Sequence, residues 1–116
     1  MGCWYWSVLV GFCVLSSSVR GADPVSFRKD IAPILEKHCV SCHSGKLPKG
    51  DLDFTTSRRL FEGGANGPTL VPGNSAKSTM IRMINDKKMP PKSTVPPAEI
   101  ARLAKWIDEG AKFDQH

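Results

Sequence analysis

Cys39-Val40-Ser41-Cys42-His43 reads Cys-x-x-Cys-His, and the rest of the chain is best interpreted outward from this stretch. The spacing is typical of covalent attachment of a c-type haem. Two thiols separated by two residues can reach the two vinyl groups of one porphyrin and form thioethers. The next residue, His43, is then placed to supply an axial imidazole to the iron. The pattern predicts haem attachment at Cys39 and Cys42 and iron ligation by His43.

Other interpretations of two nearby cysteines are a zinc site, a redox dithiol and a structural pair. A structural zinc site usually has four protein ligands, often as two close pairs. No second Cys-x-x-Cys or His-x-x-His pair follows Cys42. A disulfide across so short a loop removes little chain entropy and stabilises little. A zinc-binding interaction module nevertheless stays open as an alternative.

Residues 1–22 have the pattern of a secretory signal peptide. Met1 to Leu15 is apolar and aromatic, Ser16-Ser17-Ser18 follows, and the small residues Gly21 and Ala22 come next. A short apolar run with a small-residue exit is typical of an export signal. It is shorter than the roughly 20 apolar residues that a spanning helix needs. We expect cleavage near Ala22, a periplasmic or otherwise exported protein, and no membrane span afterwards; the alternative is an uncleaved tether.

Residues 23–116 are predicted to form one small monohaem domain. Cys3 and Cys13 leave with the signal, so Cys39 and Cys42 are the remaining thiols. Arg20 is the one charged residue that is lost, which lowers the net charge from +5 to +4. The basic residues are scattered without a run of the kind that binds nucleic acid. We therefore expect a monomer whose partners are redox proteins, with an acidic surface on the partner and no nucleic acid.

The apolar pattern predicts a mostly helical domain. Apolar residues recur at helical spacing in several segments. We expect helices over residues 25–38, 56–62, 75–85 and 98–109. In the first, Asp30 is the candidate N-cap, and Pro33 falls in the first turn, where its missing N–H has no partner to lose. Between the last two, Pro90-Pro91 and Pro96-Pro97 indicate an extended strap over residues 87–97.

A haem held by His43 needs a second axial ligand or has an open site. The candidates after the motif are Met80, Met83, Met89 and His116. Met80 and Met83 lie on the apolar stripe of an expected helix, where a methionine usually belongs to the core. His116 is the last residue, and chain ends tend to be mobile. Met89 lies in the stiff proline strap, which can hold a thioether over an iron at low entropic cost. Met89 is therefore favoured.

A series of motifs in fixed order runs through the chain: Phe27 to Leu35, Cys39 to His43, Gly50 to Asp53, Gly63-Gly64, Gly67-Pro68, Val71 to Gly73, Ser78, Met89 to Pro91 and Trp106 to Ala111. With these motifs the chain resembles the planctomycete-type cytochrome c domain, a class I-like monohaem cytochrome c. The resemblance implies a small all-α fold of about four short helices and long loops wrapped around one covalent haem c. It also implies that Met89 is the distal ligand.

The resemblance further implies that the N- and C-terminal helices cross, so that the Phe27/Ile31 face meets the Leu103/Ile107 face. In this family the domain often precedes large additional domains, whereas this chain ends at His116. We therefore expect a stand-alone exported electron carrier rather than an enzyme. His/Met coordination fits that function because it leaves no vacant site and raises the reduction potential. The alternative is a small peroxidase-type haem enzyme, but no distal His or Arg is evident.

Two residues are predicted as additional haem contacts. Arg58, or its neighbour Arg59, is a candidate partner of a haem propionate, because a guanidinium matches a carboxylate in two contacts. The alternative for both is a solvated helix face. Leu70 ends the segment Gly67-Pro68-Thr69-Leu70, which resembles the class I segment that places a backbone carbonyl against the proximal imidazole. The alternative is an ordinary turn.

Four other side chains receive simpler interpretations. His38 adjoins Cys39 but is expected to point away from a haem held by His43, so we expect it at the surface. Trp106 is expected in the core or against the haem. Lys87 and Lys88 flank the strap, where they either steer an acidic partner toward a haem edge or provide solubility.

Overall fold

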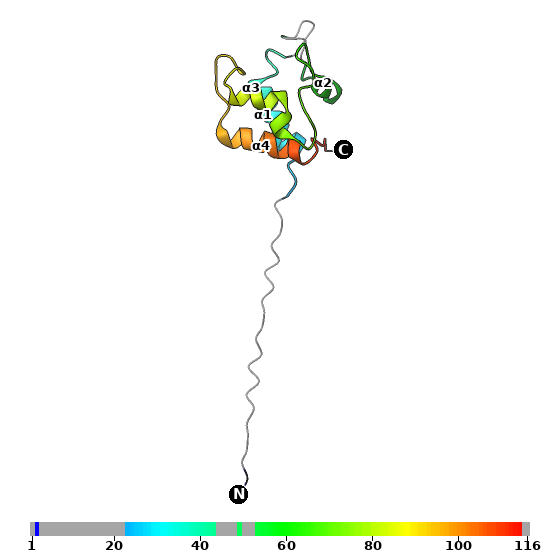
Figure 1. The fold of residues 1–116 in the computed structure, drawn as a ribbon, viewed down its shortest axis with the longest axis vertical. Coiled ribbons are helices and arrows are strands. Elements are labelled where there is room, and N and C mark those ends of the chain that lie inside the picture. Colours follow the sequence, from blue (N-terminus) through cyan, green and yellow to red (C-terminus); the bar gives the residue numbers. More distant parts are fainter. Residues whose placement is uncertain (1, 3–22, 44–48, 50–52, 115–116) are drawn as a thin grey trace.

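The structure is a computed structural model that describes residues 2, 23–43, 49 and 53–114. Within these residues it contains four α-helices and no strand, which confirms the predicted all-α class (Figure 1). Apart from Gly2, the predicted signal peptide lies outside the described residues. None of the helices that the structure describes is both long and apolar enough to cross a membrane.

The helical elements follow one another with irregular segments between them. In chain order they are the π-helical turn η1 (Phe27–Ile31), α1 (Ala32–His38), α2 (Ser57–Glu62), the 3-10 turn η3 (Ser75–Lys77), α3 (Thr79–Asn85) and α4 (Pro97–Asp108). The helices predicted over 56–62 and 98–109 are confirmed to within one residue. The segment predicted over residues 87–97 contains no helix before Pro97, as expected, but turns and bends over residues 86–93 largely replace the extended backbone that the prolines indicated, and Pro97 already begins α4.

The first helix begins differently from the prediction, because Ser26 and not Asp30 is its N-cap. The Ser26 hydroxyl accepts a hydrogen bond from the Lys29 N–H at 3.1 Å. The Asp30 carboxylate accepts one from the Ser26 N–H at 2.9 Å. This reciprocal arrangement satisfies donors at the start of a helix, so the helical turn starts before Asp30. Pro33, which lacks an N–H, lies at the start of α1.

The prediction of a single helix over residues 75–85 is also wrong, since Ser78 separates the turn η3 from helix α3. Ser78 is fully buried and has an extended backbone. Its hydroxyl donates to the Asn74 carbonyl and accepts from the Val71 N–H, both at 2.9 Å. These two bonds tie the segment before η3 to the start of α3. The apolar period continues through Ser78, which is why the sequence pattern does not reveal the break.

The first and last helical elements that the structure describes, η1 and α4, pack together, as the expected crossing requires. One core buries Ile31 of η1 together with Trp106 and Ile107 of α4. The ring centroids of Phe27 and Trp106 lie 5.4 Å apart. Phe113 lies against both aromatic rings. The core also contains residues of α1, α2, α3 and the connecting segments: Ile34, Leu35, Leu60, Leu70, Met80, Ile81, Ile84, Val95, Leu103 and Ala111.

Asp114 caps the N-terminus of η1 from the far end of the chain. Its carboxylate accepts hydrogen bonds from the Ser26 hydroxyl and from the backbone N–H groups of Arg28 and Phe27. These bonds, the Ser26 hydroxyl first, hold the pKa of Asp114 below its ordinary value of 3.8. A lowered folded pKa means that the stabilisation is present above pH 3.8 and is lost as the pH falls through the folded value.

We predict that Asp114→Asn lowers the thermal midpoint at pH 7 by several degrees. The two midpoints should converge well below pH 3.8, where the wild-type carboxylate is protonated as well. Thermal unfolding followed by circular dichroism at a series of pH values measures both effects. Glu36→Gln, at an exposed carboxylate on α1, is the control and should leave the midpoint nearly unchanged. An undiminished difference at the acid end would contradict the assignment.

Candidate haem-binding site

The Cys-x-x-Cys-His motif forms a tight turn directly after α1. Cys39 is the C-cap residue, and its N–H donates to the Leu35 carbonyl at 2.8 Å. The Cys39 carbonyl accepts from the N–H groups of Cys42 and His43 at 3.2 and 3.0 Å. Helix α1 therefore continues into a turn that gathers both thiols and the imidazole within five residues of one another.

Both cysteines of the motif are free thiols and are half-buried. Burial raises the pKa of the Cys39 thiol to about 11, and the neighbouring Cys42 contributes because two thiolates would repel. Cys39 is therefore protonated at neutral pH. The thiol pair thus differs from the low-pKa dithiol of a redox enzyme, in which the attacking cysteine is a thiolate.

His43 is oriented by a backbone carbonyl, but not by the one that the sequence indicated. Its Nδ1 lies 2.9 Å from the Lys49 carbonyl oxygen. A carbonyl can only accept, so Nδ1 carries the proton and Nε2 keeps its lone pair for a metal. The Lys49 N–H in turn donates to the Cys42 carbonyl at 3.0 Å. Lys49 thus links Cys42 and His43.

The segment from Gly67 to Leu70, proposed to supply this carbonyl, is engaged elsewhere. Gly67 pairs with Gly64 in an isolated bridge, and the Thr69 carbonyl accepts from the Met80 N–H at 3.1 Å. Leu70 is buried in the core. The turn needs glycine at position 63, because a side chain there would come within 2.0 Å of the Gly67 carbonyl oxygen. The structure thus gives the Nδ1 contact to Lys49 rather than to this segment, and a Leu70 contact with haem stays a prediction.

Met89 combines a fixed backbone with an exposed side chain. The Met83 carbonyl at the end of α3 accepts from the N–H groups of both Lys88 and Met89, at 2.9 and 3.1 Å. The peptide bond from Met89 to Pro90 is cis. The Met89 side chain is nevertheless 37% exposed, an unusual position for a large apolar residue. Figure 1 shows the strap on one side of α3 and α2 on the other.

The other candidate ligands occupy different surroundings. Met80 is buried in the core, as its helical stripe predicted. Met83 is half-buried on the same helix. His116 lies outside the described residues. Among the described methionines that follow the motif, Met89 is thus the one whose thioether faces outward from a fixed backbone.

The two predicted propionate partners differ in their contacts. Arg58 pairs with Glu62 at 2.7 Å, one turn along α2, and its side chain is 86% exposed. Arg59 instead reaches back to the Asp53 carboxylate at 2.9 Å. The role of Arg58 at a haem stays a prediction. Lys87 and Lys88 are exposed at the start of the strap.

His38 is not at the surface, contrary to the sequence interpretation. Its side chain is only 7% exposed, and its Nε2 lies 2.7 Å from the Glu99 carboxylate. The reason is that His38 ends α1 on the side that meets the first turn of α4, so burial is offset by a hydrogen bond. Lys37 also approaches Glu99, at 3.8 Å. The contact ties the residue before Cys39 to α4.

We predict that Glu99→Ala lowers the free energy of unfolding by about 1–3 kcal/mol, because it leaves the buried His38 ring without its partner. Urea unfolding of the purified protein measures this change. Glu62→Ala is the matched control, since it removes an exposed pair with Arg58 and should cost about 0.5 kcal/mol or less. Equal losses in the two variants would show that the His38 contact is an ordinary surface pair.

Sequence reasoning missed Lys49 and Asp53. Lys49 acts through its carbonyl, which every residue possesses, so no residue type marks it. Asp53 accepts hydrogen bonds from the Thr55 N–H and hydroxyl, at 2.8 and 2.6 Å. An Asp two residues before a Thr, directly ahead of a helix, is a signal for such a turn that the sequence does contain.

Residues 39–93 match the family model described as Planctomycete cytochrome C, which confirms the resemblance. The matched segment contains both motif cysteines, His43 and Met89. No curated protein and no solved structure matches the chain. Within the described residues, no group of three or more His, Cys, Asp or Glu side chains is arranged to hold a metal ion.

Proposed function

We propose that the protein, whose residues 39–93 match the planctomycete cytochrome c family model, is an exported monohaem c-type cytochrome that carries single electrons between redox partners. The observation that carries the proposal is the turn after α1. It holds two free thiols and an imidazole whose Nδ1 is already bonded to the Lys49 carbonyl.

The residues of this turn fit a covalently attached haem. Cys39 and Cys42 are reduced and unpaired, which is the form that adds to a vinyl group. The Lys49 carbonyl fixes the imidazole tautomer and raises the basicity of the ligating nitrogen. When bound, haem c supplies a one-electron iron couple. The chain supplies the two thioether bonds and His43 as the first axial ligand.

Met89 is proposed as the second axial ligand. Its backbone is held by the Met83 carbonyl, so little chain entropy remains to be lost when the side chain binds. Met80 is packed in the core and would have to leave it to bind a metal. A His/Met pair closes both axial positions, which favours electron transfer over catalysis at the iron. A small peroxidase-type enzyme would need one position open.

The family also bears on location and partners. A cytochrome c domain exchanges electrons with redox partners, and such domains are typically exported. The apolar run and small-residue exit within residues 1–22 support export. The exposed Lys87 and Lys88 beside Met89 support a partner with an acidic surface, because opposite charges speed encounter at low ionic strength. We propose that the protein acts as a monomer.

We predict that the chain, expressed with its export signal in a host able to attach haem, carries one covalent haem with low-spin absorption bands. Denaturing electrophoresis with haem staining and optical spectroscopy measure both properties. Cys42→Ala should lose one thioether, and the α-band should shift because one vinyl group remains unsaturated. A purified protein that contains zinc and no haem would refute the function.

We predict that Met89→Ala abolishes the far-red methionine-to-iron band of the oxidised protein and lowers the midpoint potential. The reason is that a thioether ligand stabilises reduced iron, and the variant lacks this ligand. Met83→Ala, on the neighbouring helix, is the matched control and should keep the band. If Met83→Ala or Met80→Ala loses the band while Met89→Ala keeps it, the ligand assignment is wrong.

A further inference from the structure

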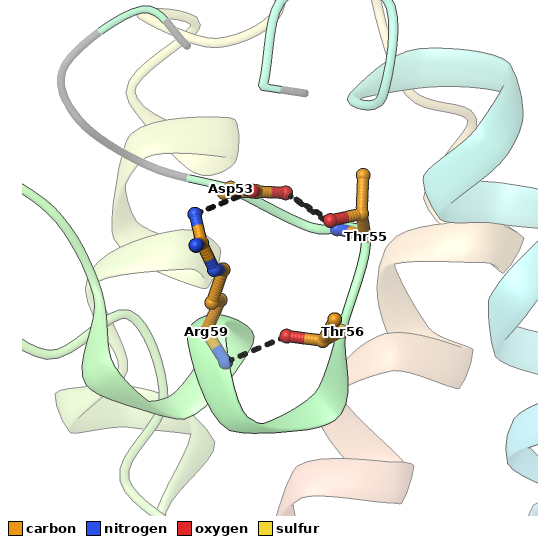
Figure 2. Close-up of polar contacts among 4 residues, drawn as sticks. All are labelled: Asp53, Thr55, Thr56 and Arg59. Carbon is orange, nitrogen blue, oxygen red and sulfur yellow. Dashed lines mark hydrogen bonds and ion pairs between the residues drawn. The ribbon is translucent and has the colours of Figure 1, made fainter. Parts of the chain in front are cut away.

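Asp53 is a buried carboxylate with an unusually complete set of donors for a residue in an irregular segment. It is 6% exposed. One oxygen accepts from the Thr55 N–H and hydroxyl, and the other accepts from the Arg59 guanidinium at 2.9 Å (Figure 2). The Thr55 hydroxyl, the Thr55 N–H and Arg59 together hold the pKa of Asp53 below its ordinary value of 3.8. The group is therefore a carboxylate at neutral pH and has little freedom to rotate.

These contacts join the turn to helix α2. Thr56 is the N-cap of α2, and its hydroxyl accepts from the Arg59 N–H at 3.2 Å. Arg59 thus bonds the cap through its backbone and Asp53 through its side chain (Figure 2). We call Asp53, Thr55 and Arg59 the clamp. Because Leu60 anchors α2 in the core, the clamp links a rigid element to the segment that follows the haem motif.

Phe54 lies between the clamp residues Asp53 and Thr55 along the chain, and it contacts His43. Its N–H donates to the His43 carbonyl at 2.8 Å. Its ring centroid lies 5.2 Å from that of the imidazole, with the planes inclined by 43°. Since the residues on both sides of Phe54 are fixed, its backbone and ring can hold His43 from the side while the Lys49 carbonyl holds Nδ1. The imidazole is thereby constrained by two separate segments.

We propose that Asp53 is a positioning residue for His43: through the clamp it fixes Phe54, which sets the orientation of the imidazole and keeps Nδ1–H bonded to the Lys49 carbonyl. The carboxylate does not touch His43 itself. The consequence for a bound iron rests on the proposed function, whereas the constraint on the imidazole follows from the contacts of the chain. Asp53 then affects the basicity of the axial ligand indirectly, because it helps to keep the hydrogen bond between His43 Nδ1–H and the Lys49 carbonyl.

Hydrogen exchange of two ring protons tests this proposal. The His43 Nδ1–H reports the bond to Lys49, and the Trp106 Nε1–H, which donates to the Lys112 carbonyl at 2.8 Å, reports the core. Both are followed by NMR on the reduced, diamagnetic protein. We expect Asp53→Ala to speed exchange at His43 by about tenfold or more, as the loss of hydrogen bonds to a charged group would, and to leave Trp106 unchanged.

Two variants on α2 serve as controls. Arg59→Lys keeps a positive charge near Asp53 but loses the planar fork, so it should give an intermediate increase at His43. Glu62→Ala removes the exposed pair with Arg58 on the same helix and should change neither proton. If Asp53→Ala is too unstable to purify, Arg59→Lys and Thr55→Val carry the test, and both should speed exchange at His43 selectively.

The outcomes separate the clamp from the function. Equally faster exchange of the His43 and Trp106 protons would show that Asp53 only stabilises the fold. Unchanged exchange at both protons would show that the clamp does not constrain the imidazole. Either result overturns the proposal. The protein could also be isolated without haem, which would refute the proposed function. If Asp53→Ala then still speeds exchange at His43 alone, relative to the haem-free wild type, the clamp stands. A haem-free wild type whose His43 proton exchanges at the free rate would overturn both.

Discussion

The packing of η1 and of the segment after α4 around Trp106 is the interaction on which the rest of the described domain depends. Phe27 and Phe113 lie against this indole, and its Nε1 donates to the Lys112 carbonyl. The Val25 N–H reaches the Glu109 carboxylate across the same junction. A domain of this size buries a modest core, and Trp106 is the largest of its fully buried side chains, so the contacts around this ring matter for the whole domain. Because η1 is fixed in this way, α1 has a defined direction and delivers Cys39 at a defined point.

The remaining elements are arranged around that core, and the proposed ligand side chains lie on irregular segments that are bonded to it. The turn after α1 is bonded through Lys49, and the strap is bonded at its start through Met83 and anchored at its end by the buried Val95. Each segment is irregular, yet part of its backbone is hydrogen-bonded: Cys42, His43 and Lys49 donate in the turn, and Lys87, Lys88 and Met89 donate in the strap. The proposed ligands His43 and Met89 therefore come from irregular segments whose backbone is hydrogen-bonded at the ligand itself.

Local signals in the sequence predicted the elements well where the deciding contact is itself local. Thr56 caps α2, Gly63 ends it with a left-handed backbone, and the prolines exclude helix from the strap, all within a few residues. The errors have the opposite character. Ser78 breaks a helix because Val71 bonds its hydroxyl, and His38 is buried because Glu99, sixty-one positions away, meets its ring. A periodic pattern contains no information on such partners.

The sequence by itself determined the features that point to the proposed chemistry: the Cys-x-x-Cys-His spacing, the match of residues 39–93 to a cytochrome c family model, and the methionine followed by two prolines. These follow from residue identity and spacing along the chain. Only the tertiary structure decided which carbonyl orients His43 and which carboxylate lies behind Phe54. Lys49 acts through a backbone atom that every residue has, and Asp53 acts through a side chain that contacts Arg59 only after α2 has formed. Neither contact exists until the chain has folded, so residue identity alone cannot specify it.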